Sequence, residues 1–173
     1  MCNKIEYINI NEKSINELME SKNYRKLIAS GNILLSANYD LHTIQNIRFI
    51  NEFSMLNSFD NITLRNLIFD RNVKFSACFS GKILFENIIF KEDVNFSSYF
   101  CFSKNTGSNN RTEFNNVRFE GNVDFKGFNL QLEYQQFILE TANFTHKPKN
   151  LKHILQHKDF NRQVDDINNR NYN

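Results

Sequence analysis

The sequence predicts an all-β solenoid, and three observations support this prediction. An Asn-aliphatic-x-Phe element followed by Val-x-Phe recurs as NLIFDRNVKF (66–75), NIIFKEDVNF (87–96) and NVRFEGNVDF (116–125). The copies are about 20 residues apart, since Phe49 to Phe69 is 20 residues and Phe69 to Phe90 is 21. Within each copy, apolar residues flank a single polar residue, which is the period of a short strand followed by a corner.

Four columns of large residues define the repeat, at steps of 5, 6 and 4 residues within one copy. The columns are Ile44, Leu64, Phe85 and Phe114; Phe49, Phe69, Phe90 and Phe119; Met55, Phe75, Phe96 and Phe125; and Phe59, Phe79, Phe100 and, off register, Phe128. A second inward position lies two residues earlier and holds Ile, Leu or Val in most copies, with His42 and Thr112 in the first column. The residues between are mostly polar, with Ile68 and Ile89 as exceptions.

Four corners in about 20 residues predict a four-sided coil of the chain. Coils of this kind stack at the strand spacing of about 4.8 Å, so that phenylalanine rings lie above one another. The in-register Asn46, Asn66, Asn87 and Asn116 are then expected at one corner, with their amides bonded to each other or to the turn backbone. A leucine-rich repeat, a three-sided hexapeptide helix and a helical solenoid each need a different spacing.

On these residues the chain resembles the pentapeptide-repeat family. The large central residue of the family matches at Leu64, Phe69, Phe75, Phe85, Phe90, Phe96, Phe114, Phe119 and Phe125. The resemblance covers residues 41–130 and extends to Ala142-Asn143-Phe144, and it implies a right-handed four-sided parallel β-helix of about 4–5 coils. Val, Ile and Leu stand where the family prefers a small residue, which predicts a swollen or distorted square.

Three segments divide the chain. Residues 1–40 are expected to form an N-terminal cap of a strand and a helix, because Ser14 to Glu17 is a capping box and the apolar pattern ends near Gly31. Residues 41–146 form the β-helix, with an inserted loop at about 101–111. Residues 147–173 form a C-terminal helix (150–160) and a frayed tail, so that short helical caps close both ends. Alternatively, the N-terminal helix binds a partner, or the C-terminal end forms a homodimer, as the resemblance implies.

Composition narrows the class of protein. The net charge of +2 favours neither nucleic acid nor a membrane surface, so we expect no direct nucleic-acid binding. The sequence contains no apolar run of 18 residues and no secretory signal at its start, which predicts no membrane association. Three cysteines, Cys2, Cys78 and Cys101, lack metal-binding spacing, and an odd number fits a reduced, cytoplasmic setting.

No residue set commits the chain to an enzyme activity, and we assign no catalytic, cofactor-binding or metal-binding residue. His153 and His157 have helical zinc spacing, with His146 nearby, but the chain has no H-E-x-x-H motif. Cys78 and Cys101 are 23 residues apart rather than 21 and need not stack. The corner acids are expected to be a solvated surface interleaved with Arg71 and Lys91; these acids are Asp70, Glu92, Asp93 and Glu120.

A non-catalytic scaffold that binds another protein through the loop and the caps is the function the sequence favours, although the binding residues are unknown. The resemblance implies one alternative, a DNA mimic that protects a type II topoisomerase such as gyrase. Mimicry needs a strongly negative rod, whereas residues 41–146 hold ten Lys and Arg against eleven Asp and Glu. A structural remnant of a longer repeat protein is the third interpretation.

Overall fold

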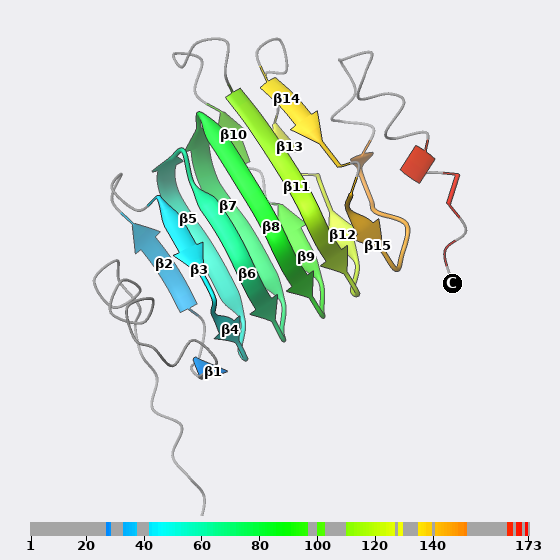
Figure 1. Cartoon of the computed structure of the whole chain (residues 1–173), viewed down its shortest axis with the longest axis horizontal. Helices are drawn as coiled ribbons and strands as arrows, with labels where there is room; N and C mark the ends of the chain where they lie inside the picture. Colours follow the sequence, from blue (N-terminus) through cyan, green and yellow to red (C-terminus); the bar gives the residue numbers. More distant parts are fainter. Residues whose placement is uncertain are drawn as a thin grey trace, which may run out of the picture.

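Two parallel β-sheets make up most of the described structure (Figure 1). The structure is a computed structural model, and it describes residues 27–28, 33–37, 42–96, 100–102, 110–126, 128–129, 135–139, 141–151, 166–167, 169–170 and 172. Each strand pair within these ranges is parallel, and successive repeats lie side by side along the long axis of the molecule. The all-β, parallel character predicted from the repeat is confirmed, and the arrangement is compatible with a β-solenoid.

The first sheet contains eight strands. Its main order is β1 (Leu27–Ile28), β4 (Arg48–Phe49), β6 (Thr63–Phe69), β8 (Lys82–Phe90), β11 (Asn110–Phe119) and β14 (Gln135–Ile138). Two further strands complete it, β3 (Thr43–Gln45) beside β6 and β15 (Asn143–Phe144) beside β11.

The second sheet contains seven strands and lies behind the first in Figure 1. They are β2 (Ile33–Ala37), β5 (Phe53–Asp60), β7 (Val73–Ser80), β9 (Val94–Phe96), β10 (Phe100–Phe102), β12 (Val123–Asp124) and β13 (Phe128–Asn129). Both β9 and β10 pair with β7, so that consecutive segments of one repeat continue the same sheet.

The core lies between the two sheets and is built from the predicted columns. Along β8, Ile83, Phe85, Ile88 and Phe90 are fully buried, and the residues between them are exposed or partly buried. This alternation is interrupted at Asn87, where the chain turns a corner and resumes it. Thr112 is also fully buried, as its predicted inner position requires, whereas His42 is exposed, so its predicted inner position is wrong.

Phenylalanine rings form stacks that run across the repeats. The longest stack passes through Phe49, Phe69, Phe90, Phe119 and Phe144, with centroids 4.8–5.0 Å apart and planes within 8° of parallel. A second joins Phe75, Phe96 and Phe125 at 5.2 and 5.0 Å. The spacing of about 5 Å follows from the strand separation, because in-register residues of neighbouring parallel strands repeat at that distance. The predicted ladders are confirmed.

Edge-to-face contacts join the two sheets. The Phe75 ring of the second sheet lies 5.5 Å from Phe85 and 6.2 Å from Phe90 of the first, and both pairs are inclined at 85°. Phe96 and Phe114 repeat the arrangement one repeat later, at 6.1 Å and 86°. Stacking along the axis and perpendicular contacts across it are both favoured by the ring quadrupole.

The repeat begins earlier than predicted. Leu27 and Ile28 form a strand that pairs with Arg48 and Phe49, and Ile33–Ala37 pairs with β5. The predicted helix is therefore wrong at Leu27 and Ile28, because pairing with β4 and β5 overrides the local helical pattern, and the repeat extends into the predicted cap (1–40). The rest of the predicted helix lies outside the described residues.

The register changes in the fourth column. Val73 pairs with Val94, but Cys78 pairs with Cys101, so the offset grows from 21 to 23 residues. Phe79 consequently pairs with Phe102, and Phe100 pairs with Phe128, which corrects the predicted alignment of Phe79 with Phe100. The predicted loop is shorter than 101–111, because β10 ends at Phe102 and β11 begins at Asn110.

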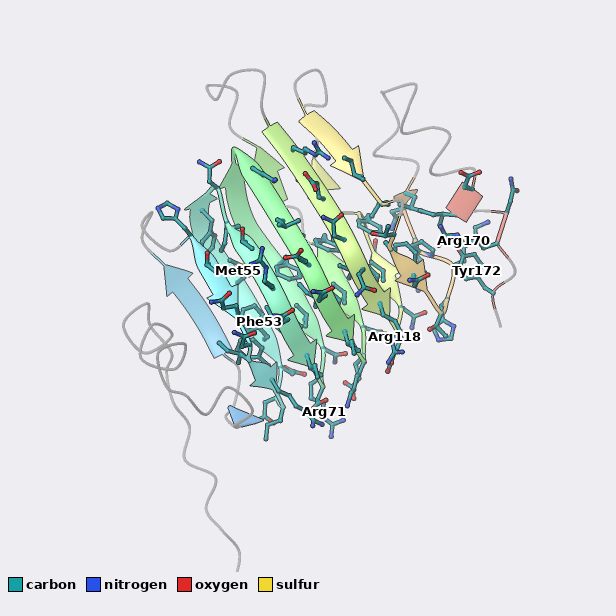
Figure 2. All side chains as sticks on the ribbon, in the orientation of Figure 1. Phe53, Met55, Arg71, Arg118, Arg170 and Tyr172 are labelled. Atoms are coloured by element: carbon teal, nitrogen blue, oxygen red, sulfur yellow. The ribbon has the colours of Figure 1, made fainter. Side chains whose placement is uncertain are left out.

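A further copy of the repeat and a cap lie at the C-terminal end. Asn143 and Phe144 pair with Arg118 and Phe119, which confirms the repeat predicted at Ala142-Asn143-Phe144. Ile167 is 1% exposed and belongs to the core, and Arg170 Nη1 donates to the Ala142 carbonyl at 2.8 Å (Figure 2). The tail is therefore not frayed at these residues, because it covers the last repeat. Of the predicted helix at 150–160, the structure describes only residues 150 and 151.

In the described ranges, no helix is long and apolar enough to cross a membrane.

Candidate interaction face

A ladder of asparagines forms one corner of the first sheet. Asn46, Asn66, Asn87 and Asn116 all have left-handed backbone, with φ between 52° and 60°. The Nδ2 atom of each later asparagine donates to the Oδ1 atom of the one before, at 2.9, 3.1 and 2.8 Å. Asparagine tolerates this backbone and supplies both donor and acceptor, so one residue type solves both requirements. The ladder predicted from the sequence is confirmed.

Replacing Asn87 in the middle of this ladder should destabilise the protein. Asn87→Ala places a Cβ-only residue at φ 53° and removes two amide bonds, and we expect a loss of about 2 kcal/mol in the free energy of unfolding. Asn87→Gly is the matched control, because it relieves the backbone but also lacks the amide. We expect the glycine variant to be about 1 kcal/mol more stable than the alanine variant in urea unfolding, and equal values would refute the role of the left-handed corner.

The neighbouring corner joins the repeats through side chains that accept from the backbone. Asn72 Oδ1 accepts from the Asp93 amide at 3.2 Å, and Asp93 Oδ1 accepts from the Asn122 amide at 2.8 Å. Beside this row, Arg71 Nη1 lies 2.6 Å from Glu92 Oε1. The acids at this corner thus bind the next or the previous repeat, and nothing in this geometry activates a carboxylate for catalysis.

Asp70 connects three successive repeats on the outer surface. Arg48 donates to both of its carboxylate oxygens, at 2.7 and 3.2 Å, and Lys91 Nζ lies 2.7 Å from Oδ1. Partial burial raises the pKa of the Asp70 carboxyl, but the hydrogen bonds and charges of Arg48 and Lys91 outweigh it. The pKa of Asp70 therefore lies below its ordinary value.

This depressed pKa predicts a specific pH dependence. The contribution of Asp70 is complete above its unfolded-state pKa of about 3.9 and is lost as the pH falls through the lower folded-state value. Because the Arg48 and Lys91 side chains are 43% and 40% exposed, screening limits the contribution to about 1 kcal/mol. We expect Asp70→Asn to lower the free energy of unfolding at pH 6 and to differ less from the unsubstituted protein at pH 3. A constant difference between the two pH values would contradict this assignment.

A partly exposed apolar pair interrupts the charged outer surface of the first sheet. Ile68 of β6 and Ile89 of β8 are register partners, and each is partly exposed on the side of the strand opposite the core. Their row begins with Arg48 of β4 and continues to Arg118 of β11. We call these four residues the apolar-basic row. Leu84 of β8 is also partly exposed, in the row that begins at the other end of the strand.

The basic residues of the row are already held in place. Arg48 binds Asp70 as described, and Arg118 Nη2 lies 2.5 Å from Glu120 Oε1 on its own repeat (Figure 2). These contacts order the guanidinium groups beside the isoleucines, and more than half of the Arg118 side chain is exposed. The row can therefore offer an apolar centre with ordered polar edges, which is the usual composition of a protein-binding surface.

The residues considered for chemistry are not brought together. His42 and His146 are exposed, and His153 and His157 lie outside the described residues. Glu92 pairs with Arg71, Glu120 with Arg118, and Asp70 with Arg48 and Lys91, as expected of a surface. Among the residues described, no group of three His, Cys, Asp or Glu side chains is arranged to hold a metal ion.

Taken together, the described structure is that of a parallel β repeat protein with a ladder-built surface. No family model matches the chain, and neither a curated protein nor a solved structure matches it. The apolar-basic row is the site that sequence reasoning left unassigned. Its only signal in the sequence is the appearance of isoleucine at positions 68 and 89, where other copies carry a charged or polar residue.

Proposed function

We propose that the chain is a right-handed four-sided β-helix of about 4–5 coils, related to the pentapeptide-repeat proteins. The repeated corners at Asn46, Asn66, Asn87 and Asn116 support this architecture, as do the steps that bring each phenylalanine column back into register. The large aliphatic residues at the inner positions are buried, which supports a wider interior than small residues would give.

In this proposal the protein is a non-catalytic scaffold that binds another protein in the cytoplasm. The observation that carries it is the apolar-basic row. Ile68 and Ile89 expose apolar surface on the middle strands of a sheet whose other outward residues are mainly polar. A ladder of paired strands holds such a row rigid, so little conformational entropy is lost when a partner binds.

The same surface disfavours mimicry of DNA. Each described acid discussed above is paired with a cation, and the Arg65 guanidinium likewise pairs with Glu86. A surface of paired charges does not present the uncompensated negative charge of a phosphate backbone. The scaffold role therefore remains our single proposal.

Site-specific cross-linking tests the scaffold role. A photoreactive phenylalanine analogue at position 89 should cross-link a protein in extracts of the native cells, and the same analogue at Asn95, an exposed residue of β9, should not. Ile68→Lys should abolish the cross-link at position 89 without unfolding the protein, because the residue is partly exposed. Equal products at both positions, or no product at either, would count against the apolar-basic row. Deletion of residues 103–109 shows separately whether the predicted loop contributes.

A further inference from the structure

Two cysteines that the sequence does not align are register partners in the second sheet. Cys78 of β7 pairs with Cys101 of β10, although they are 23 residues apart. The shift arises because five residues separate Phe96 from Cys101, whereas three separate Phe75 from Cys78. The two extra residues fall within the stretch between β9 and β10, and pairing resumes beyond them with cysteine opposite cysteine.

The backbone spacing at this pair suits a disulfide bond. Directly paired residues of neighbouring parallel strands have Cα atoms about 4.8 Å apart. A disulfide needs a Cα separation of roughly 4.4–6.8 Å, so closure requires no movement of the two strands apart or together. The same row continues to Asn129 of β13, which is two strand spacings from Cys78 and therefore beyond disulfide reach.

We propose that Cys78 and Cys101 form a reversible dithiol–disulfide site that joins β7 to β10. The oxidant is a low-molecular-weight disulfide such as oxidised glutathione. One cysteine thiolate attacks a glutathione sulfur, the glutathione S–S bond breaks and one glutathione thiol leaves. The second cysteine thiolate then attacks the protein sulfur of this mixed disulfide and releases the second glutathione. The protein loses two protons and two electrons, and the oxidant accepts both.

The position of the pair explains what the bond would do. The register change makes the region between β9 and β10 the one described place where the repeat is not continued at 20 or 21 residues within one sheet strand row. A covalent bond immediately after the change would fix the new register, since β7 and β10 could no longer slide. The site is independent of the scaffold role proposed above, which involves the other sheet.

The test uses the full chain with Cys2→Ser, so that Cys78 and Cys101 are the only thiols. On incubation of the folded protein with oxidised glutathione, we expect loss of two hydrogen atoms by intact mass and a peptide linking positions 78 and 101. Ellman titration after denaturation should find no free thiol, and the thiols should return when dithiothreitol is added.

The control variant carries Cys2→Ser, Cys101→Ser and Asn129→Cys, which keeps two thiols but places them two strands apart. We expect its intramolecular disulfide to form at least about 10-fold more slowly, because its strands must move before the sulfurs meet. Equal rates in the two proteins would overturn the proposal. So would persistent mixed glutathione disulfides, disulfides only between molecules, or thiols that stay free in the Cys2→Ser protein, which retains both members of the pair.

Discussion

Phe90→Ala should be among the most destabilising single substitutions in this protein. The side chain is fully buried and lies 5.0 Å from both Phe69 and Phe119, with its plane 8° from each. Truncation removes both stacking contacts and the edge contact to Phe75, and it leaves a cavity between two sheets that cannot close independently. We expect the free energy of unfolding to fall by about 4 kcal/mol in urea or thermal unfolding.

The neighbouring residue provides the matched control. Ile89→Ala shortens an apolar side chain on the same strand, but this residue faces away from the core and is partly exposed. We expect it to cost less than about 1 kcal/mol. If the two substitutions cost the same, residue 90 is not inside a packed core.

Gly121→Ala should have the second large effect. A Cβ atom at this residue would lie 2.3 Å from the Glu92 carbonyl carbon and 2.7 Å from the Asp93 amide nitrogen. Both are backbone atoms of the previous repeat, which neighbouring bonds hold in place, including Glu120 N to Phe90 O at 2.8 Å. The two repeats must therefore separate at this corner, and we expect a cost of about 3 kcal/mol.

The equivalent position one repeat earlier is the control for Gly121. Glu92 occupies that position, so a side chain is accommodated there. Glu92→Ala removes only the exposed pair with Arg71 and should change the free energy of unfolding by less than about 1 kcal/mol. Unchanged stability in Gly121→Ala would show that the backbones are farther apart at this corner than the structure indicates.

The parts of the fold that repeat could be predicted because each inner position meets the same environment in every copy. Phe69, Phe90 and Phe119 contact one another through in-register strands, so a spacing of 20 or 21 residues, or one period plus an insertion, is a direct consequence of the sheet. The asparagine corner was predictable for the same reason, since the left-handed backbone recurs wherever the chain turns.

Other parts could not be predicted because local and tertiary preferences disagree. Ile28 lies 21 residues before Phe49, and Leu35 lies 20 before Met55, so a periodic signal for β1 and β2 was present. The capping box at Ser14 and the apolar spacing up to Ile28 favoured a helix instead. The register shift at Cys101 depends on two inserted residues that no spacing rule assigns to one side or the other.

The C-terminal contacts and the candidate site carry no periodic signal either. Ile167 packs on the core, and Tyr172 donates to the Ile167 carbonyl, yet the sequence there is rich in Asn and Asp and suggests an unstructured tail. The apolar-basic row is visible only as two unexpected isoleucines until the register places Arg48 and Arg118 in the same row.

The stacking of phenylalanines across in-register repeats is the central claim, and a crystal structure of the full chain tests it most directly. The prediction is that the rings of Phe49, Phe69, Phe90, Phe119 and Phe144 form one continuous stack with centroids about 5 Å apart between two parallel sheets. Electron density that places Phe69 and Phe90 in separate parts of the core, or exposes either ring to solvent, would contradict it.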